Sequence, residues 1–173
     1  MQSVTLSSPE DREITSVNGD HGKTYNDVWW FSSNVKNFNN FPKNIKKVFP
    51  NVEYVHIMMA NITNLTKTDM AQFGSQLITF SLPFNNIEVL EEGLFDENPN
   101  LKDITLSSNK IKFVASGVFD KLPKLKTLWF SGNPCRAYDI LSDRAAVLSL
   151  IKNIEEKCQD LEARQSTSGS LKI

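Results

Sequence analysis

Residues 77–87, LITFSLPFNNI, decide the fold, because the same pattern returns at 101–111 as LKDITLSSNKI and at 125–135 as LKTLWFSGNPC. Apolar residues fill the first, fourth and sixth positions of each copy, and asparagine fills the ninth. The three copies start 24 residues apart. A fixed period of this length indicates a solenoid, whose coils must stack because a single coil cannot bury its own apolar side.

Each copy predicts a short strand followed by a turn. The alternation around the fourth and sixth positions is typical of a strand with one apolar face. The asparagine stands where the chain leaves that strand, and its amide can bind free backbone groups of the turn. We therefore expect Asn85, Asn109 and Asn133 to form a ladder in which each binds its own loop and that of its neighbour.

The repeats extend towards the N-terminus with weaker matches. Residues 52–62, VEYVHIMMANI, fit the pattern with Ala60 in the asparagine position, and residues 25–35, YNDVWWFSSNV, fit with Ser33 there and a longer loop. In this frame the second tryptophan of the pair points inward and the first points outward. A frame shifted by one residue would instead bury Trp29 and Phe31 and expose Trp30. The preferred frame gives four full repeats and a fifth, truncated repeat over residues 25–135.

The flanks predict two caps. Asn18-Gly19 is a strong hairpin turn signal, so residues 1–24 are expected to form a small N-terminal hairpin over the first coil. Residues 136–162 are expected to form a capping helix that begins after Asp139 or Ser142, and the Ser- and Gly-rich tail 163–173 is expected to be disordered. Spacings of three and four predict an apolar helix face made of Leu141, Ala145, Leu148, Ile151, Ile154 and Cys158.

The repeats resemble leucine-rich repeats, in the extracellular form that carries a phenylalanine in the returning loop, here Phe95 and Phe119. Residues 14–28 resemble the leading flank of secreted arthropod members, and Asn133-Pro134-Cys135 before a helix resembles the C-terminal flank of extracellular members. This resemblance implies an α/β solenoid: a leucine-rich repeat horseshoe with a curved parallel sheet, an N-terminal β-hairpin cap and a C-terminal α-helical cap. It also implies a secreted, extracellular protein that recognises ligands, in innate immunity, adhesion or ligand capture.

The chain has two cysteines and two glycosylation sequons. Cys135 occupies an inward repeat position and Cys158 the apolar face of the predicted helix, so a disulfide would hold that helix to the last coil; the alternative is two buried free thiols. Such a bridge would close a loop of about 23 residues and contribute about 3 kcal/mol. The sequons begin at Asn61 and Asn64, where the chain is expected to leave the concave sheet.

Composition argues against several function classes. The charge is balanced, with 19 basic and 20 acidic residues, which gives no reason to expect a nucleic-acid partner. No apolar run reaches the length of a membrane-spanning helix. His21 and His56 lie in no nucleophile motif, and no phosphate-binding loop occurs. Two cysteines without a nearby histidine make an incomplete zinc site. The sequence thus predicts a non-enzyme without cofactor or metal.

The outward strand residues carry the functional prediction. Side chains alternate along a strand, so the residues between the inward ones lie on the concave sheet. Met59 and Ile78 are expected beside the resulting patch. The predicted partner-binding residues are Trp29, Phe31, Tyr54, His56, Met58, Phe84 and Trp129.

An exposed apolar patch of this kind usually marks a partner site. The leading hypothesis is a non-catalytic extracellular recognition module that binds a protein ligand through the concave face. The alternative function is a self-associating structural or adhesion protein that dimerises through the same aromatic patch. In another alternative, the N-terminal cap covers the patch and no partner binds there. A lipid or small-molecule carrier fits poorly, because the interior of a solenoid is filled.

Overall fold

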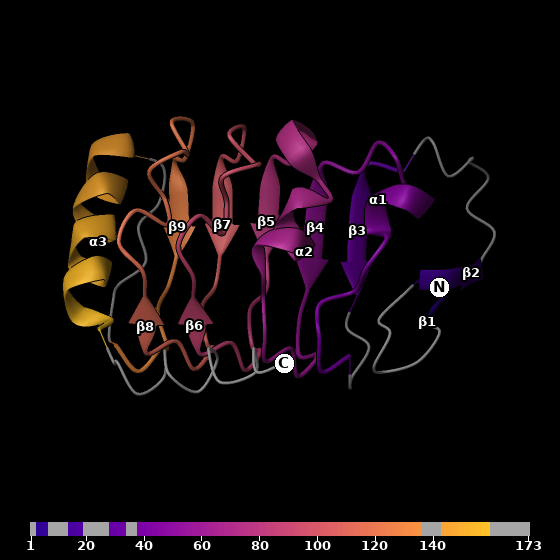
Figure 1. Cartoon of the computed structure of the whole chain (residues 1–173), viewed down its shortest axis with the longest axis horizontal. Coiled ribbons are helices and arrows are strands. Elements are labelled where there is room, and N and C mark those ends of the chain that lie inside the picture. Colours follow the sequence, from indigo (N-terminus) through magenta and orange to yellow (C-terminus); the bar gives the residue numbers. More distant parts are fainter. Residues whose placement is uncertain (1–2, 7–13, 19–27, 34–37, 136–142, 160–173) are drawn as a thin grey trace, which may run out of the picture.

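Five short parallel strands form one sheet along the length of the molecule (Figure 1). The computed structural model describes residues 3–6, 14–18, 28–33, 38–135 and 143–159. Neighbouring strands come from successive coils, so the order in the sheet is the order in the chain. The strands are β3 (Trp30–Ser33), β4 (Tyr54–Ile57), β5 (Thr79–Ser81), β7 (Asp103–Thr105) and β9 (Thr127–Trp129).

The return half of each coil carries shorter elements. Strands β6 (Val89–Leu90) and β8 (Phe113–Val114) pair in a second parallel sheet. In the earlier coils the return segments hold short helices instead. These are α1 (Ile45–Val48), α2 (Lys67–Ala71) and the 3₁₀ turn η2 (Gly74–Gln76).

The core lies between the two halves of the coils. Phenylalanines from successive coils contact one another, beginning with Phe41, which packs against Phe73 and Phe80. The series continues from Phe80 to Phe95 and on to Phe119, with ring centroids 5.8 to 6.1 Å apart along the whole series. All five rings are buried, so the repeats share one continuous apolar core, as the period predicts.

The asparagine ladder is confirmed. Asn109 Nδ2 donates to Leu82 O of the preceding coil at 2.8 Å and to Leu106 O of its own coil at 3.1 Å, while its Oδ1 accepts from Ile87 N at 3.1 Å. Asn85 and Asn133 make the equivalent pairs of bonds to the coils before them. Each amide thereby satisfies buried backbone groups that the turn would otherwise leave unpaired.

The predicted frame of the first repeat is wrong. Phe31 pairs in register with Val55, and Ser33 pairs with Ile57, so β3 lies 24 residues before β4 rather than 27. Phe31 is therefore a core residue, with 4% of its surface exposed, and Ser33 fills an inward strand position instead of the asparagine position. The frame shifted by one residue is correct for Phe31, which is buried, and for Trp30, which is exposed, but wrong for Trp29, which is exposed as well. Residues 28–31 are all apolar, so no alternation marks the inward side.

Helix α3 (Arg144–Lys157) packs at the β9 end of the solenoid (Figure 1). Its N-cap is Asp143, whose Oδ1 accepts from Ala145 N at 3.0 Å, and not Ser142 or Asp139. Leu148, placed on the buried face by the sequence, has half of its surface exposed. The buried face of α3 consists of Val147, Leu150, Ile151 and Ile154. The predicted helix is thus present, and Ile151, Ile154 and Cys158 are buried as predicted. Ala145 and Leu148 are exposed instead, and Val147 and Leu150 are buried in their place.

The predicted N-terminal hairpin is present as an antiparallel pair of strands, but its turn does not lie at Asn18-Gly19. Strand β1 (Ser3–Leu6) pairs antiparallel with β2 (Ile14–Asn18), so Asn18 ends the second strand and does not form the turn between the two. Covering of the first coil by this pair stays a prediction, and the predicted disordered tail 163–173 lies outside the described residues. Within the described ranges no helix is both long and apolar enough to span a membrane.

Candidate functional site on the concave sheet

Two rows of outward side chains cross the concave face of the five-stranded sheet. The parallel register sets both rows, because paired residues of neighbouring strands project from the same face. Row one consists of Trp30, Tyr54, Thr79, Asp103 and Thr127. Row two consists of Ser32, His56, Ser81, Thr105 and Trp129.

Three rings at the β3 end form what we call the aromatic cluster: Trp29, Trp30 and Tyr54. The Tyr54 ring lies 5.2 Å from Trp29 and 6.2 Å from Trp30, centroid to centroid. The rings of Trp30 and Tyr54 are nearly parallel, at 22°, whereas the Trp29 ring stands at 61° to Trp30 and 78° to Tyr54. Both tryptophans keep about half of their surface exposed, 48% for Trp29 and 55% for Trp30.

Two further apolar side chains, which we call the apolar rim, lie where β4 and β5 end: Met59 and Phe84. They are 46% and 53% exposed, and both have a positive φ, 55° and 56°. The equivalent residues of the next two coils are Ser108 and Gly132, also with positive φ. Glycine and small polar residues suit this left-handed conformation, but methionine and phenylalanine do not.

The centre of the concave face is polar. His56 Nδ1 lies 2.8 Å from Ser81 Oγ within row two, and Thr79 Oγ1 donates to Asp103 Oδ2 at 3.3 Å within row one. Partial burial lowers the pKa of His56 below its ordinary value, since desolvation disfavours the charged imidazolium. His56 therefore faces a partner as a neutral ring at neutral pH.

Residues 75–134 match the family model described as leucine rich repeat. The fold is a leucine-rich repeat solenoid.

Solved leucine-rich repeat structures agree with this fold. The chain superimposes on the TLR13–ssRNA13 complex with 24% identity and a TM-score of 0.53, covering 59% of this chain and 14% of that one. It superimposes on the Toll–Spatzle complex, described as a hub in Drosophila development and innate immunity, with 23% identity and a TM-score of 0.52, covering 64% and 15%. The chain thus spans about one seventh of the length of either relative. No curated protein matches the sequence.

Most of the predicted binding residues lie on the concave face of the leucine-rich repeats. Trp29, Tyr54 and His56 lie at its N-terminal half, with half-buried Met58 and exposed Phe84 nearby. Trp129 lies at the opposite end, on β9, and is 37% exposed. Phe31 is the exception, because its side chain is in the core.

Sequence reasoning missed Trp30, which was placed in the core and is the most exposed of the three tryptophans. One signal could have found it. Phe31 stands one repeat of 24 residues before Val55. Trp30 therefore takes the outward position that Tyr54 holds in the next coil. Ser32 likewise lies opposite His56, and it is exposed.

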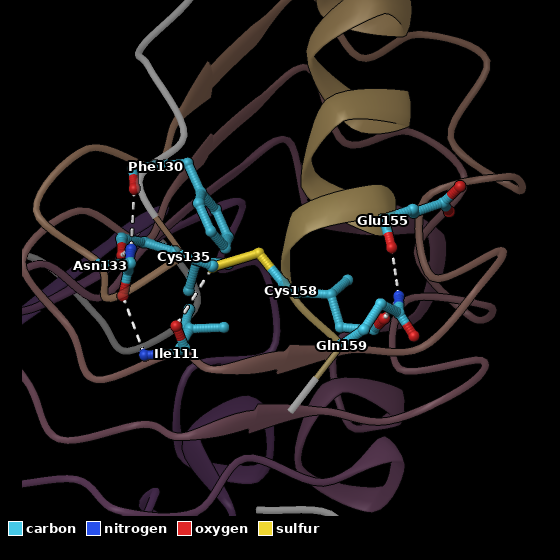
Figure 2. The surroundings of a disulfide bond; sticks show 9 residues. Ile111, Phe130, Asn133, Cys135, Glu155, Cys158 and Gln159 are labelled. Atoms are coloured by element: carbon cyan, nitrogen blue, oxygen red, sulfur yellow. Dashed lines mark hydrogen bonds between the residues drawn. A yellow bond between two sulfur atoms is a disulfide. The ribbon is translucent and has the colours of Figure 1, made fainter. Parts of the chain in front are cut away.

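The predicted disulfide is present: Cys135 is bonded to Cys158, with their Cα atoms 5.1 Å apart (Figure 2). Cys158 is fully buried at the C-terminal end of α3. Its backbone O accepts from Val114 N at 2.8 Å, and Gln159 Nε2 donates to Glu155 O. The end of the helix is thereby fixed to two consecutive coils.

The sequon asparagines follow β4, at the edge where the chain leaves the sheet, as predicted. Asn61 and Asn64 are both exposed, which leaves room for a glycan. Thr63 Oγ1 donates to Asn39 O at 3.1 Å, and Thr66 forms the capping box of α2 with Asp69. Glycosylation of either asparagine stays a prediction.

Within the part of the chain that the structure describes, no group of three or more His, Cys, Asp or Glu side chains could hold a metal ion. On the return side, Lys121 Nζ contacts Asp96 Oδ2 at 2.8 Å across neighbouring coils. This ion pair raises the pKa of Lys121, mainly through its hydrogen bond to Asp96.

Proposed function

We propose that this chain is a non-catalytic recognition module that binds a protein ligand outside the cell. The binding surface is the N-terminal half of the concave face, made of the aromatic cluster and the apolar rim. The observation that supports this proposal most strongly is that four large apolar side chains are exposed on this half: Trp29, Trp30, Met59 and Phe84. Exposed apolar patches mark interaction sites, and aromatic residues and methionine are enriched at interface centres.

The apolar rim supports the proposal through backbone strain. A residue other than glycine in the left-handed region costs on the order of 1–3 kcal/mol. Burial would offset that cost, but Met59 and Phe84 are about half exposed in the isolated chain. A partner that covers these side chains would supply the missing burial. Ser108 and Gly132 show that the same turn forms without a large side chain.

The extracellular setting rests on the disulfide. Structural disulfides persist in oxidising compartments and are rare in the cytosol. The exposed sequons at Asn61 and Asn64 fit the same setting. Among the structural relatives, Toll is seen in complex with the protein Spatzle. Ligand capture, including a role in innate immunity, is the biological function we propose for such a module.

The test is partner retrieval with a matched pair of variants. Extracellular fluid of the source is passed over the immobilised chain, and bound proteins are identified by mass spectrometry. The double variant Met59→Ser with Phe84→Ser copies the residue that the next coil uses, so the fold should be kept while the partner is lost. Leu148→Ser is the control, because Leu148 is equally exposed but lies on α3.

Two outcomes contradict the proposal. Retention of the same partner by the double variant and by Leu148→Ser would place recognition elsewhere on the molecule. A doubled molar mass in light scattering that falls to the monomer value in the double variant would instead assign the surface to self-association.

A further inference from the structure

We propose that the aromatic cluster receives a lysine or arginine side chain of the protein partner, with Glu53 as its counter-charge. This inference rests on the proposed recognition function, and it specifies what the partner must present.

The geometry leaves ring faces open. Trp29 stands at 61° and 78° to the other two rings, so the three rings cannot all cover one another's faces. About half of each tryptophan surface is accessible. The face of an aromatic ring carries negative charge density, and a cation within about 6 Å of the ring centre is attracted to it, most strongly to tryptophan.

The described outward rows carry few charges. Row one and row two together hold a single carboxylate, Asp103, and neither row contains lysine or arginine. The row that begins with Trp29 and Glu53 continues with Ile78, Lys102 and Lys126, so its two lysines belong to the C-terminal coils. Glu53 directly precedes β4, and its backbone lies beside that of Trp29, since Glu53 N donates to Trp29 O at 2.9 Å. His56 is neutral at neutral pH and adds no positive charge.

These charges favour a cation over an apolar anchor. An apolar side chain seated on the cluster would desolvate the half-buried Glu53 without pairing it, which is unfavourable. An ammonium or guanidinium group instead places its charge against the ring faces and the carboxylate at once. Arginine suits the site particularly well, because its planar guanidinium stacks on aromatic faces and binds carboxylates in a fork.

The direct test is a titration followed at the tryptophan side chains. The ¹⁵N-labelled chain gives three indole N–H signals, from Trp29, Trp30 and Trp129, which single Trp→Phe variants assign. The probes are the blocked tripeptides Gly-Arg-Gly, Gly-citrulline-Gly and Gly-norleucine-Gly. We expect the arginine peptide to shift the Trp29 and Trp30 signals saturably and to leave the distant Trp129 signal unchanged.

The neutral citrulline peptide, which keeps the shape of arginine, should bind about two- to fivefold more weakly, as expected for a cation on exposed rings. Glu53→Gln should weaken arginine binding severalfold without changing citrulline binding. Its control is Glu91→Gln, an exposed carboxylate on the return side. Trp30→Leu keeps an apolar surface but removes one ring, and should reduce the preference for arginine over citrulline.

Equal binding of the arginine and citrulline peptides would overturn the inference, as would tighter binding of the norleucine peptide or equal shifts at Trp129. These results would leave the proposed function standing, because the Met59 and Phe84 variants test it by partner retrieval. Loss of the partner in those variants together with equal peptide binding would mean that the concave face recognises something other than a cation.

Discussion

Replacing Asn109 with alanine is expected to lower the free energy of unfolding by about 3 kcal/mol. The Asn109 amide is buried and joins two coils: its Oδ1 is the acceptor for Ile87 N, and its Nδ2 donates to Leu82 O and Leu106 O. The alanine variant leaves the Ile87 N–H without this acceptor. An unsatisfied buried donor costs about 1–3 kcal/mol, and the two carbonyls lose a net contribution of about 1 kcal/mol each at most.

The matched control is Asn100→Ala, at the end of the coil before that of Asn109. Asn100 also bonds to the coil that precedes its own, with Nδ2 donating to Ser75 O at 2.7 Å, and it accepts from Lys124 Nζ. Both of these bonds are exposed, so water can replace the lost amide. The free energy of unfolding should fall by less than about 1 kcal/mol. Both amides connect neighbouring coils, so the difference in the free energy of unfolding between the two variants reports the effect of burying these hydrogen bonds.

Urea unfolding followed by tryptophan fluorescence and far-UV circular dichroism measures both variants. In a chain of this length each kcal/mol shifts the melting temperature by roughly 2–4 °C, so Asn109→Ala should melt about 6–12 °C below the parent. Equal destabilisation by the two substitutions would refute the reasoning. A loss below about 1 kcal/mol for Asn109→Ala would show that the ladder does not hold the coils together.

Three further predictions use other parts of the molecule. Phe31→Ala should lower the free energy of unfolding in urea by about 3–5 kcal/mol, because it empties a core position. Trp30→Ala should lower it by less than about 0.5 kcal/mol, because Trp30 is exposed. The reverse order would mean that the frame of the first repeat is misassigned. Cys135→Ser combined with Cys158→Ser should lower stability by about 3 kcal/mol through loss of a 23-residue closed loop, and unchanged melting would show that the bridge does not staple the helix. The pKa of His56 in the folded state lies below its unfolded value, which is near 6.5. The stability that neutral His56 contributes is therefore present above pH 6.5 and is lost as the pH falls towards the folded-state pKa. His56→Gln should remove this part of the pH dependence in thermal melts.

The sequence predicted the regular repeats well because their pattern allows only one register. From Leu77 onward the apolar positions alternate with polar ones and end in an asparagine, so a shift by one residue would bury polar side chains. The first repeat offers no such contrast. Four apolar residues in a row precede Ser32, and Ser33 puts a hydroxyl in a position that later coils fill with isoleucine, leucine or phenylalanine.

The capping helix shows a similar limit. Val147, Leu148, Leu150 and Ile151 stand close together in the sequence and cover more than one side of the helix. More than one apolar stripe can be drawn through them, and docking against the last coils decides which side is buried. Docking leaves Leu148 in solvent. For the candidate site, alternation alone located Tyr54, His56 and Met58, but the correct frame of β3 was needed to find Trp30.

The Cys135–Cys158 bridge makes the two ends of the solenoid unequal. Contacts in a solenoid join mainly neighbouring coils, so opening spreads from an end inward. The α3 end is closed covalently, whereas the chain has no cysteine with which to close the β3 end. Opening should therefore run in one direction, starting at β3. The aromatic cluster lies at this end, so a ligand bound there would act as a second clamp, and its affinity could be measured as an increase in resistance to unfolding.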